Sequence, residues 1–345
     1  MTTLSKPKIF GTGLIALDLV MGVDEHTPVR SWAGGTCGNV LSIMAYLGWD
    51  AFPIARMNGD PASQRVRADM RKWGVQLKFA SCSPASHTPI IIQQIRRGRD
   101  GLPRHRFSWA CPRCGQWLPG YKAVTLNAVE RIIPDLTNAS VFFMDRLSPT
   151  ALVLAKEASQ KGALVFFEPS AKSNEKLLND ALQLAHVVKY ADQRLSGLGK
   201  LIESSPSLRL EIQTQGSKGL RYRHRYAKRF SVWHHLDAFK PPVLADTCGS
   251  GDWCTAGILF MAAREGFDGM LATDANGIHE ALRYGQALAA WNCGFEGARG
   301  GMYTIDRKAF DRQVAALLSG EEYSMPRPRK GRASVAISCP ACPTH

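Results

Sequence analysis

Short apolar runs of β type alternate with capped helical segments along most of the chain. Asp60 is placed to cap a helix that starts at Pro61 and ends at Gly74, and the pattern recurs from Ser148 to Gly162. Strands are expected at residues 8–11, 51–55, 141–144, 163–167, 187–189 and 210–214. Such alternation is typical of a mostly parallel sheet covered by helices, so we expect an α/β fold.

Two stretches depart from this alternation. Residues 89–95 are rich in β formers and run into a polar, Arg-rich insertion that contains the string CPRCG. Residues 221–236 alternate basic and aromatic side chains, as in an exposed hairpin. We interpret both as additions to one domain over residues 1–323, with the Cys-containing insertion near residues 96–120 and a basic, Cys-containing tail over residues 324–345.

The composition favours a soluble globular protein. Hydrophobic residues make up 45% and charged residues 21% of the chain, and no apolar run is long enough for a membrane span. The first residues resemble a β-strand more than a signal peptide, so a cytoplasmic location is expected. Nine cysteines, an odd number, favour reduced thiols or metal ligation over a disulfide framework.

The formal net charge of +14 raises the question of nucleic-acid binding. The basic residues form local clusters near residues 96–106, 221–229 and 327–332, with no recognisable nucleic-acid-binding motif beside them. A solvated surface that attracts anionic small molecules is therefore the favoured interpretation.

The string Ala245 to Asp252 carries the strongest chemical signal. Gly249 and Gly251 flank Ser250 where a helical run begins, so backbone N–H groups there can approach an anion without obstruction by a Cβ. Asp252 beside this anion hole can accept a proton from a hydroxyl that attacks a phosphate. A Gly-rich turn with Asp as a helix cap is the alternative for such a string taken alone.

This string resembles the D-T-x-G-A-G-D signature of ribokinase-like (PfkB) carbohydrate kinases, with Cys248 at the variable position and Ser250 in place of Ala. Three further segments are similar to family motifs and follow in family order: residues 34–39 (G-G-x-x-x-N), 59–60 (G-D) and 214–219 (T-x-G-x-x-G). The resemblance covers about residues 8 to 318. It implies a central, mainly parallel sheet flanked by helices, with a small β-rich lid.

The resemblance also implies a reaction, the transfer of the γ-phosphoryl group of ATP to a hydroxyl of a sugar or nucleoside, with Mg²⁺ as cofactor. Asp252 would be the base, and Gly249, Ser250 and Gly251 the anion hole. The residues implied in substrate binding are Asp18, Gly34, Gly35 and Asn39. Those implied in nucleotide binding are Thr214, Gly216, Gly219 and, beside the adenine, Gln286. We also expect a homodimer formed through the lid.

One family motif is absent, which leaves a second class of function open. The N-x-x-E motif that helps to organise magnesium is missing after residues 187–189, where Asp192 or Glu168 could substitute through water. A catalytically impaired sugar- or nucleotide-binding sensor is therefore an alternative, although the presence of Asp252 argues against it.

Two C-P-x-C pairs stand apart from the solitary cysteines. Cys111 with Cys114, and Cys339 with Cys342, offer the four thiolates of a structural zinc site. Free thiols, a redox pair, or pairs that never meet are the alternatives. A zinc-containing nucleic-acid-binding protein is a further, less favoured function.

Overall fold

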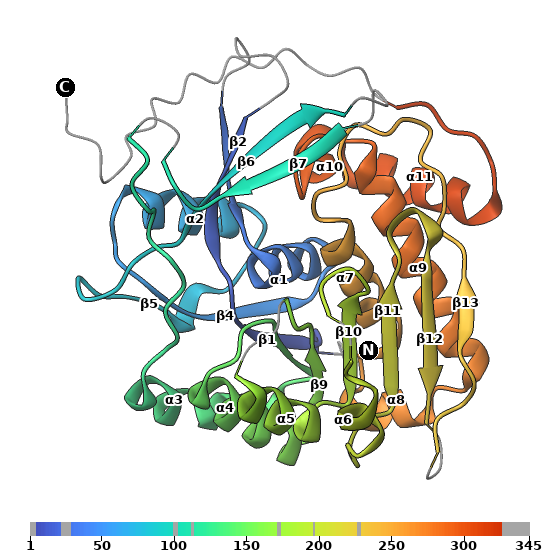
Figure 1. Ribbon diagram of the computed structural model, residues 1–345, viewed down its shortest axis with the longest axis horizontal. Coiled ribbons are helices and arrows are strands. Elements are labelled where there is room, and N and C mark those ends of the chain that lie inside the picture. Colours follow the sequence, from blue (N-terminus) through green and yellow to red (C-terminus); the bar gives the residue numbers. More distant parts are fainter. Residues whose placement is uncertain are drawn as a thin grey trace.

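The computed structural model describes residues 5–21, 29–98, 103–111, 114–170, 174–195, 197–225 and 229–325. One large sheet carries helices on both faces, and a smaller sheet lies above it in the view of Figure 1. The expected α/β architecture, with a mainly parallel central sheet and a second, β-rich unit, is confirmed.

The large sheet has nine strands in the order β13-β12-β11-β10-β9-β8-β1-β4-β5. Neighbours from β11 to β5 in this order are parallel, and β12 and β13 add an antiparallel edge. The strands are β1 (Lys8–Thr12), β4 (Asp50–Met57), β5 (Ala80–Cys82), β8 (Val141–Met144), β9 (Leu164–Phe167), β10 (Val187–Ala191), β11 (Leu210–Thr214), β12 (Leu220–His224) and β13 (His234–Leu236).

The hairpin expected at residues 221–236 is present, and it is added to the parallel sheet at its edge. Its strands β12 and β13 pair with β11 and with each other, so they extend the main sheet. Basic side chains of the hairpin stack on its aromatic rings, for example Arg221 on Trp233 and Arg225 on Phe230. This stacking explains why a strand at a sheet edge can be rich in arginine.

Helices cover both faces of the large sheet because its strands bury alternate side chains on opposite sides. Phe143 and Phe166 belong to one core cluster, whereas Phe142 and Phe167 belong to the other. The first cluster packs against α1 (Thr36–Tyr46), α2 (Pro61–Lys72), α7 (Ser250–Ala262), α8 (Gly266–Ala272), α9 (Ala275–Cys293), α10 (Gly300–Thr304) and α11 (Arg307–Ser319). The second packs against α3 (Leu126–Ile132), α4 (Pro149–Gln160), α5 (Glu175–Leu184) and α6 (Gly199–Glu203), with short 3₁₀ turns at Leu77–Phe79, Ile133–Asn138 and Gly216–Lys218 elsewhere.

The helix starts predicted from the sequence are confirmed at two sites. The Asp60 carboxylate accepts the N–H of Ser63 at 2.7 Å, and the Ser148 hydroxyl accepts the N–H of Ala151 at 3.1 Å. Each contact satisfies one of the free N–H groups at a helix start. No helix within the described ranges combines the length and apolarity needed to cross a bilayer.

The small sheet is the lid, and it has four strands in the order β3-β2-β6-β7. They are β2 (Ala16–Met21), β3 (Arg30–Gly34), β6 (Ile90–Arg97) and β7 (Pro103–Ser108). The insertion after β6 thus supplies β7, which pairs antiparallel with β6. The lid therefore combines strands from the start of the chain with strands that follow α2.

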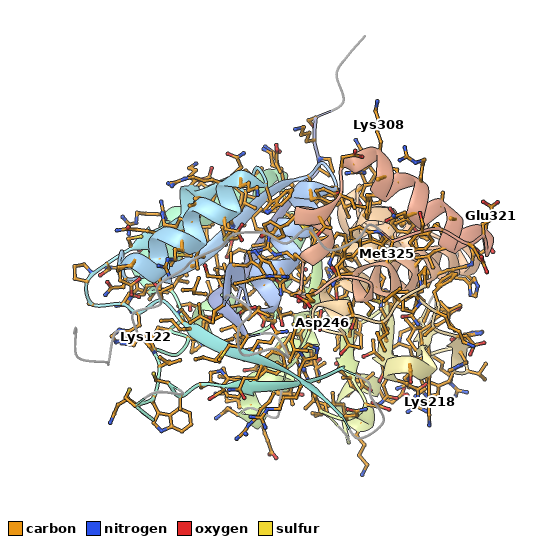
Figure 2. The ribbon with its side chains drawn as sticks, turned by 90° about the horizontal axis from the view of Figure 1, so that it is seen from above. Lys122, Lys218, Asp246, Lys308, Glu321 and Met325 are labelled. Carbon is orange, nitrogen blue, oxygen red and sulfur yellow. The ribbon has the colours of Figure 1, made fainter. Side chains whose placement is uncertain are left out.

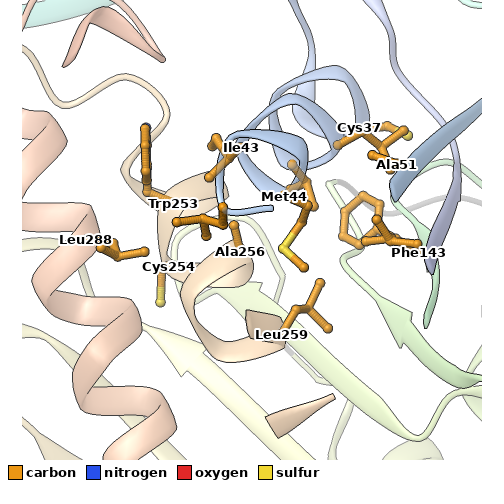
Figure 3. Close-up of a cluster of buried hydrophobic side chains, with 14 of the residues drawn as sticks. Cys37, Ile43, Met44, Ala51, Phe143, Trp253, Cys254, Ala256, Leu259 and Leu288 are labelled. Carbon is orange, nitrogen blue, oxygen red and sulfur yellow. The ribbon is translucent and has the colours of Figure 1, made fainter. Parts of the chain in front are cut away.

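Helix α7 lies at the centre of the first core cluster (Figure 3). Its Trp253 and Leu259 are buried with Met44 of α1 and Leu288 of α9. The close approach of α7 to α9 depends on glycine, because a Cβ on Gly257 would lie 2.7 Å from the Cα of Gly285. This packing fixes the start of α7, where the expected catalytic residues lie.

Candidate active site

The start of α7 has the backbone shape expected of an anion hole. Gly249 is its cap residue, with φ of 74°, and a Cβ there would collide with the carbonyl of Ala298. A side chain at this position is thus excluded by both backbone conformation and space. The N–H groups that follow at Ser250 and Gly251 begin the helix and provide donors for an anion.

The Asp246 side chain holds the loop before α7 in place through hydrogen bonds. Its carboxylate is fully buried, and it accepts the N–H groups of Cys248 and Gly297, each at 2.7 Å. In Figure 2 it lies toward the middle of the molecule, whereas Lys218 and Glu321 lie at the periphery. Asp246 therefore ties the expected anion hole to the loop that precedes α10.

Asp252 lies in the first turn of α7 and is 9% exposed. One carboxylate oxygen accepts the side-chain N–H of Asn39 at 2.7 Å. Burial, with repulsion from Glu168, raises the pKa of Asp252 well above its ordinary value, against the hydrogen bond from Asn39 and the charge of Lys189. A raised pKa strengthens Asp252 as a proton acceptor whenever it is ionised.

The expected substrate residues gather where the lid meets α1. Asp18 of β2 lies against Gly34 of β3 so closely that a Cβ on Gly34 would collide with its carboxylate. Burial raises the pKa of Asp18 to about 7, although Arg299 and the N–H of Gly35 lower it. Its Oδ1 atom is buried without a hydrogen-bond partner among the described residues, so it is available to a ligand.

Arg299 is a residue of this region that the sequence reasoning missed. It is 1% exposed, and it donates to the Asn39 side chain at 3.1 Å, to Asp69 of α2 at 2.9 Å and to the carbonyl of Ala33. The hydroxyl of Tyr303 donates to the same Asp69 at 2.8 Å. Arg299 therefore fixes Asn39, which in turn contacts Asp252. In the sequence, the only indication of a role for Arg299 is its position directly after Gly297 and Ala298.

The expected nucleotide residues lie further along the same edge of the sheet. Thr214 ends β11, and Gly216 begins a 3₁₀ turn with φ of 60°. Gly219 has φ of 92°, and a Cβ there would collide with the carbonyl of Leu236. Gln286 of α9 is 7% exposed, and its Nε2 atom has no partner among the described residues.

A buried ion pair stands between these two groups of residues. Lys189 of β10 donates to Glu168, which follows β9, at 2.6 Å, and Thr255 of α7 donates to the second oxygen of Glu168 at 2.6 Å. Burial lowers the pKa of Lys189, but the charge and hydrogen bond of Glu168 outweigh burial and raise it. The ammonium is therefore a fixed positive charge near Asp252, and sequence reasoning did not identify it.

Comparisons with known proteins agree on one fold. No family model matches the chain. An ATP-dependent ribose-1-phosphate kinase of Halopiger xanaduensis is 23% identical over 313 residues, which cover 85% of this chain and 94% of the relative. A fructokinase with bound ATP from Xylella fastidiosa has a TM-score of 0.70 at 17% identity, covering 92% of this chain and 99% of that one. A ribokinase of Giardia lamblia has a TM-score of 0.69 over the same shares.

The chain has a ribokinase-like fold. The resemblance expected from the motifs is thereby confirmed. A match of another kind, a γ-glutamyl-hercynylcysteine sulfoxide hydrolase of Mycolicibacterium smegmatis, is 26% identical over 172 residues, which cover 49% of this chain and 71% of that protein. It spans only half of the ribokinase-like chain and does not alter the fold.

The described carboxylates of this site do not form a complete cage for a metal ion. Both oxygens of Glu168 accept hydrogen bonds, and Asp192 is exposed on the turn after β10. Within the described ranges, no three His, Cys, Asp or Glu side chains are grouped to hold a metal. Asp252 and Glu168 are the carboxylates near the anion hole that would supply negative charge to a magnesium ion bound with a nucleotide.

The cysteine pairs are only partly within the described ranges. Cys111 is buried and Cys114 exposed, both as thiols, and Gly115 between Cys114 and Gln116 has φ of 73° in a tight turn. Cys339 and Cys342 lie outside the described residues, as does most of the tail over 324–345. The pairing of the four thiols is therefore a prediction.

Proposed function

We propose that this protein transfers the γ-phosphoryl group of ATP to a hydroxyl of a sugar or sugar-like small molecule. The observation that carries the proposal is the position of Asp252, which is buried in the first helical turn, beside the N–H groups of the anion hole, and bonded to Asn39 at 2.7 Å. A base, phosphate donors and a substrate-side amide close together support this reaction. The names of the kinases that the chain resembles support the same reaction.

In the proposed reaction the substrate hydroxyl gives its proton to Asp252 as its oxygen bonds to the γ-phosphorus. The bond from that phosphorus to the β,γ-bridging oxygen breaks, and ADP leaves. The N–H groups of Gly249, Ser250 and Gly251 donate hydrogen bonds to the phosphoryl oxygens and so stabilise the negative charge that develops there. Magnesium, when bound with ATP, supplies further neutralisation of phosphate charge.

In this proposal the sugar and the nucleotide are bound by different residues. Asp18 accepts a substrate hydroxyl through its free Oδ1 atom, and Asn39 orients Asp252. Gly34 and Gly35 also border the sugar in this proposal, and Gly34 leaves room for the Asp18 carboxylate. Thr214, Gly216 and Gly219 line the nucleotide, and Gln286 borders the adenine. ATP as donor implies a compartment supplied with ATP, so the cytoplasmic location is part of this proposal.

The engagement of both Glu168 oxygens favours one second candidate, a binding protein without turnover. The test is an ATP-consumption screen over neutral sugars, sugar phosphates and nucleosides, coupled with binding measurements on the same ligands. Binding of ATP and a sugar without ADP release would support the sensor and contradict the kinase.

We predict that Asp252→Asn lowers turnover by about two to four orders of magnitude, because it removes the general base. ATP affinity, measured by calorimetry, should change little. Asp237→Asn is the matched control, since the Asp237 side chain is 96% exposed and pairs only with His235 at 3.2 Å. Near-normal turnover of Asp252→Asn would remove Asp252 from the mechanism.

A structural zinc is a separate proposal, based on the two C-P-x-C pairs. We predict about one zinc per chain, held by Cys111, Cys114, Cys339 and Cys342 in a tetrahedral site. Elemental analysis of protein purified under reducing, metal-replete conditions measures it, and removal of residues after 338 should release the metal. Cys82→Ser, at an exposed solitary cysteine, is the control. Absence of zinc would contradict this proposal and leave the kinase proposal unchanged.

A further inference from the structure

Two side chains of the lid contact the loop that carries the anion hole. Gln93 of β6 lies opposite Phe107 of β7, and His105 is two residues from Phe107, so Gln93 and His105 are diagonal neighbours on one face of the lid. His105 Nδ1 lies 3.0 Å from the side-chain nitrogen of Gln93. Neither residue belongs to a motif that the sequence analysis identified.

These two side chains complete a closed ring of contacts with the loop. His105 Nε2 contacts a carboxylate oxygen of Asp246. The same oxygen accepts the N–H of Cys248 at 2.7 Å, and the Cys248 sulfur lies 3.3 Å from the side-chain oxygen of Gln93. The ring therefore runs from Asp246 through His105, Gln93 and Cys248 back to Asp246.

The direction of every hydrogen bond in the ring follows from Asp246. The backbone N–H of Thr247 also faces His105 Nε2, at 3.4 Å, but the contact of Nε2 with Asp246 is closer. An ionised carboxylate can only accept, so we assign Nε2 as the donor to Asp246 rather than as the acceptor from Thr247. In the neutral imidazole Nδ1 then accepts, which requires Gln93 to donate its amide N–H to His105 and to accept through its oxygen from the Cys248 thiol. Burial raises the pKa of the Cys248 thiol well above its ordinary value, which keeps it an S–H donor.

The loop side of this ring shapes the phosphate site directly. Asp246 is fully buried, and its second oxygen holds the N–H of Gly297 at 2.7 Å. Gly297 precedes Ala298, whose carbonyl faces Gly249 and accepts the indole N–H of Trp253 at 3.0 Å. A buried carboxylate that loses one of its donors is costly, so the geometry of this loop depends on His105.

We propose that His105 and Gln93 are positioning residues that couple the docked lid to the shape of the anion hole through Asp246 and Cys248. This inference rests on the proposed function, because it assigns the ring to the phosphoryl-transfer step. When the lid docks over a substrate, His105 supplies the last donor to Asp246 and so sets the N–H groups of Gly249 to Gly251 for the transferring phosphate. Substrate enclosure and a competent phosphate site are thereby established together.

Steady-state kinetics tests the coupling. His105→Phe keeps the size of the ring and removes the donor, so kcat with the best substrate of the screen should fall about 10- to 100-fold while the Kd for ATP changes less than about twofold. His235→Phe removes an exposed His of a similar His–Asp pair and serves as the control. Cys248→Ser, which retains a donor, should lose less kcat than Cys248→Ala. Equal kcat for His105→Phe and the control, or equal losses for both Cys248 variants, would overturn the proposal.

A second measurement does not depend on turnover. Long-range ¹H–¹⁵N correlation spectra of histidine-labelled wild-type protein report which nitrogen of each imidazole carries the proton. We expect His105, assigned by the absence of its signals in His105→Gln, to carry a proton on Nε2. A proton at Nδ1, or a spectrum that averages between tautomers like that of a free imidazole, would overturn the ring. Absence of kinase activity with an Nε2-protonated His105 would instead contradict only the proposed function.

Discussion

At the scale of single residues, Asp18 shows how burial prepares a polar group for a ligand. Its carboxyl is 8% exposed, one oxygen has no partner among the described residues, and burial raises its pKa from 3.8 to about 7. A carboxyl whose pKa is higher in the folded state binds its proton more tightly there. Ionisation of Asp18 therefore lowers the stability of the folded protein progressively as pH rises from about 4 to 7.

We predict that Asp18→Asn removes this pH-dependent cost, because the amide carries no ionisable proton. The difference in stability between variant and parent should grow from pH 5 to pH 8, by at most about 3 kcal/mol. Thermal unfolding at both pH values measures it, with Asp237→Asn as a control at an exposed position. Parallel pH profiles for Asp18→Asn and the parent would contradict the effect. The same variant should use substrate poorly and bind ATP normally.

The sequence could predict the individual polar residues of the site better than their contacts. Asp252 and Asn39 were each expected from motifs 213 positions apart, but their hydrogen bond was not. Lys189 lies where a strand was expected, and the strand pattern assigns no function to its side chain. Its role became visible only when β9 and β10 placed it 2.6 Å from Glu168. Glu168 lies 21 positions before Lys189, so no local sequence pattern indicates that the two side chains form an ion pair.

At the scale of elements, the crossing of α7 and α9 determines where Asp252 lies. Gly257 and Gly285 face each other at this crossing, and Cys254 contributes a carbonyl that a Cβ on Gly285 would approach at 2.6 Å. Small residues let the two helix backbones approach closely, and any added side chain separates them. The position of the anion hole thus depends on two glycines outside every expected motif.

We predict that Gly257→Val destabilises the protein by about 1 to 3 kcal/mol, since it overpacks the crossing. Denaturant unfolding measures this, and any activity left should be reduced as α7 shifts. Gly199→Ala is the matched control, because Gly199 starts α6 with open space around its Cα and Ala favours helix. A stability loss no greater than that of the control would show that α7 and α9 can separate without cost.

The elements themselves were predictable where pattern and caps agreed. Strands Val141–Met144 and Leu210–Thr214 have the expected bounds, and α2 and α4 start at the expected prolines. The lid strands β2 and β3 were not predicted, and β2 is buried at five successive positions rather than at alternate ones. Partners distant in sequence, with Leu17 opposite Ile90, establish the lid sheet. Such pairing is tertiary and cannot be obtained from a local pattern.

At the scale of the whole molecule, the lid bears an apolar surface that the site does not use. Phe107, Trp109 and Trp117 are 40%, 49% and 78% exposed, and Ala110 and Trp117 form an isolated bridge that fixes the segment. Exposed aromatic side chains are enriched in interaction surfaces. Phe107 belongs to β7 of the lid, and Trp109 and Trp117 lie in the segment that directly follows β7, so all three border the lid through which the homodimer was expected.

We predict that the protein is a dimer through this lid surface. Light scattering at micromolar concentration should then give about twice the chain mass of 37.9 kDa. Replacing both tryptophans, as Trp109→Lys with Trp117→Lys, should yield a monomer, because two charges on each copy would be buried against each other. Val232→Lys, at a valine 77% exposed and outside the lid, should leave the mass unchanged. If the parent protein is a monomer, or the double variant remains a dimer, the lid is not the interface.

In a dimer of this kind, docking of the lid over one site would be constrained by the lid of the other copy. Loss of the dimer should then lower kcat through the contact of His105 with Asp246 more than it lowers the affinity for ATP.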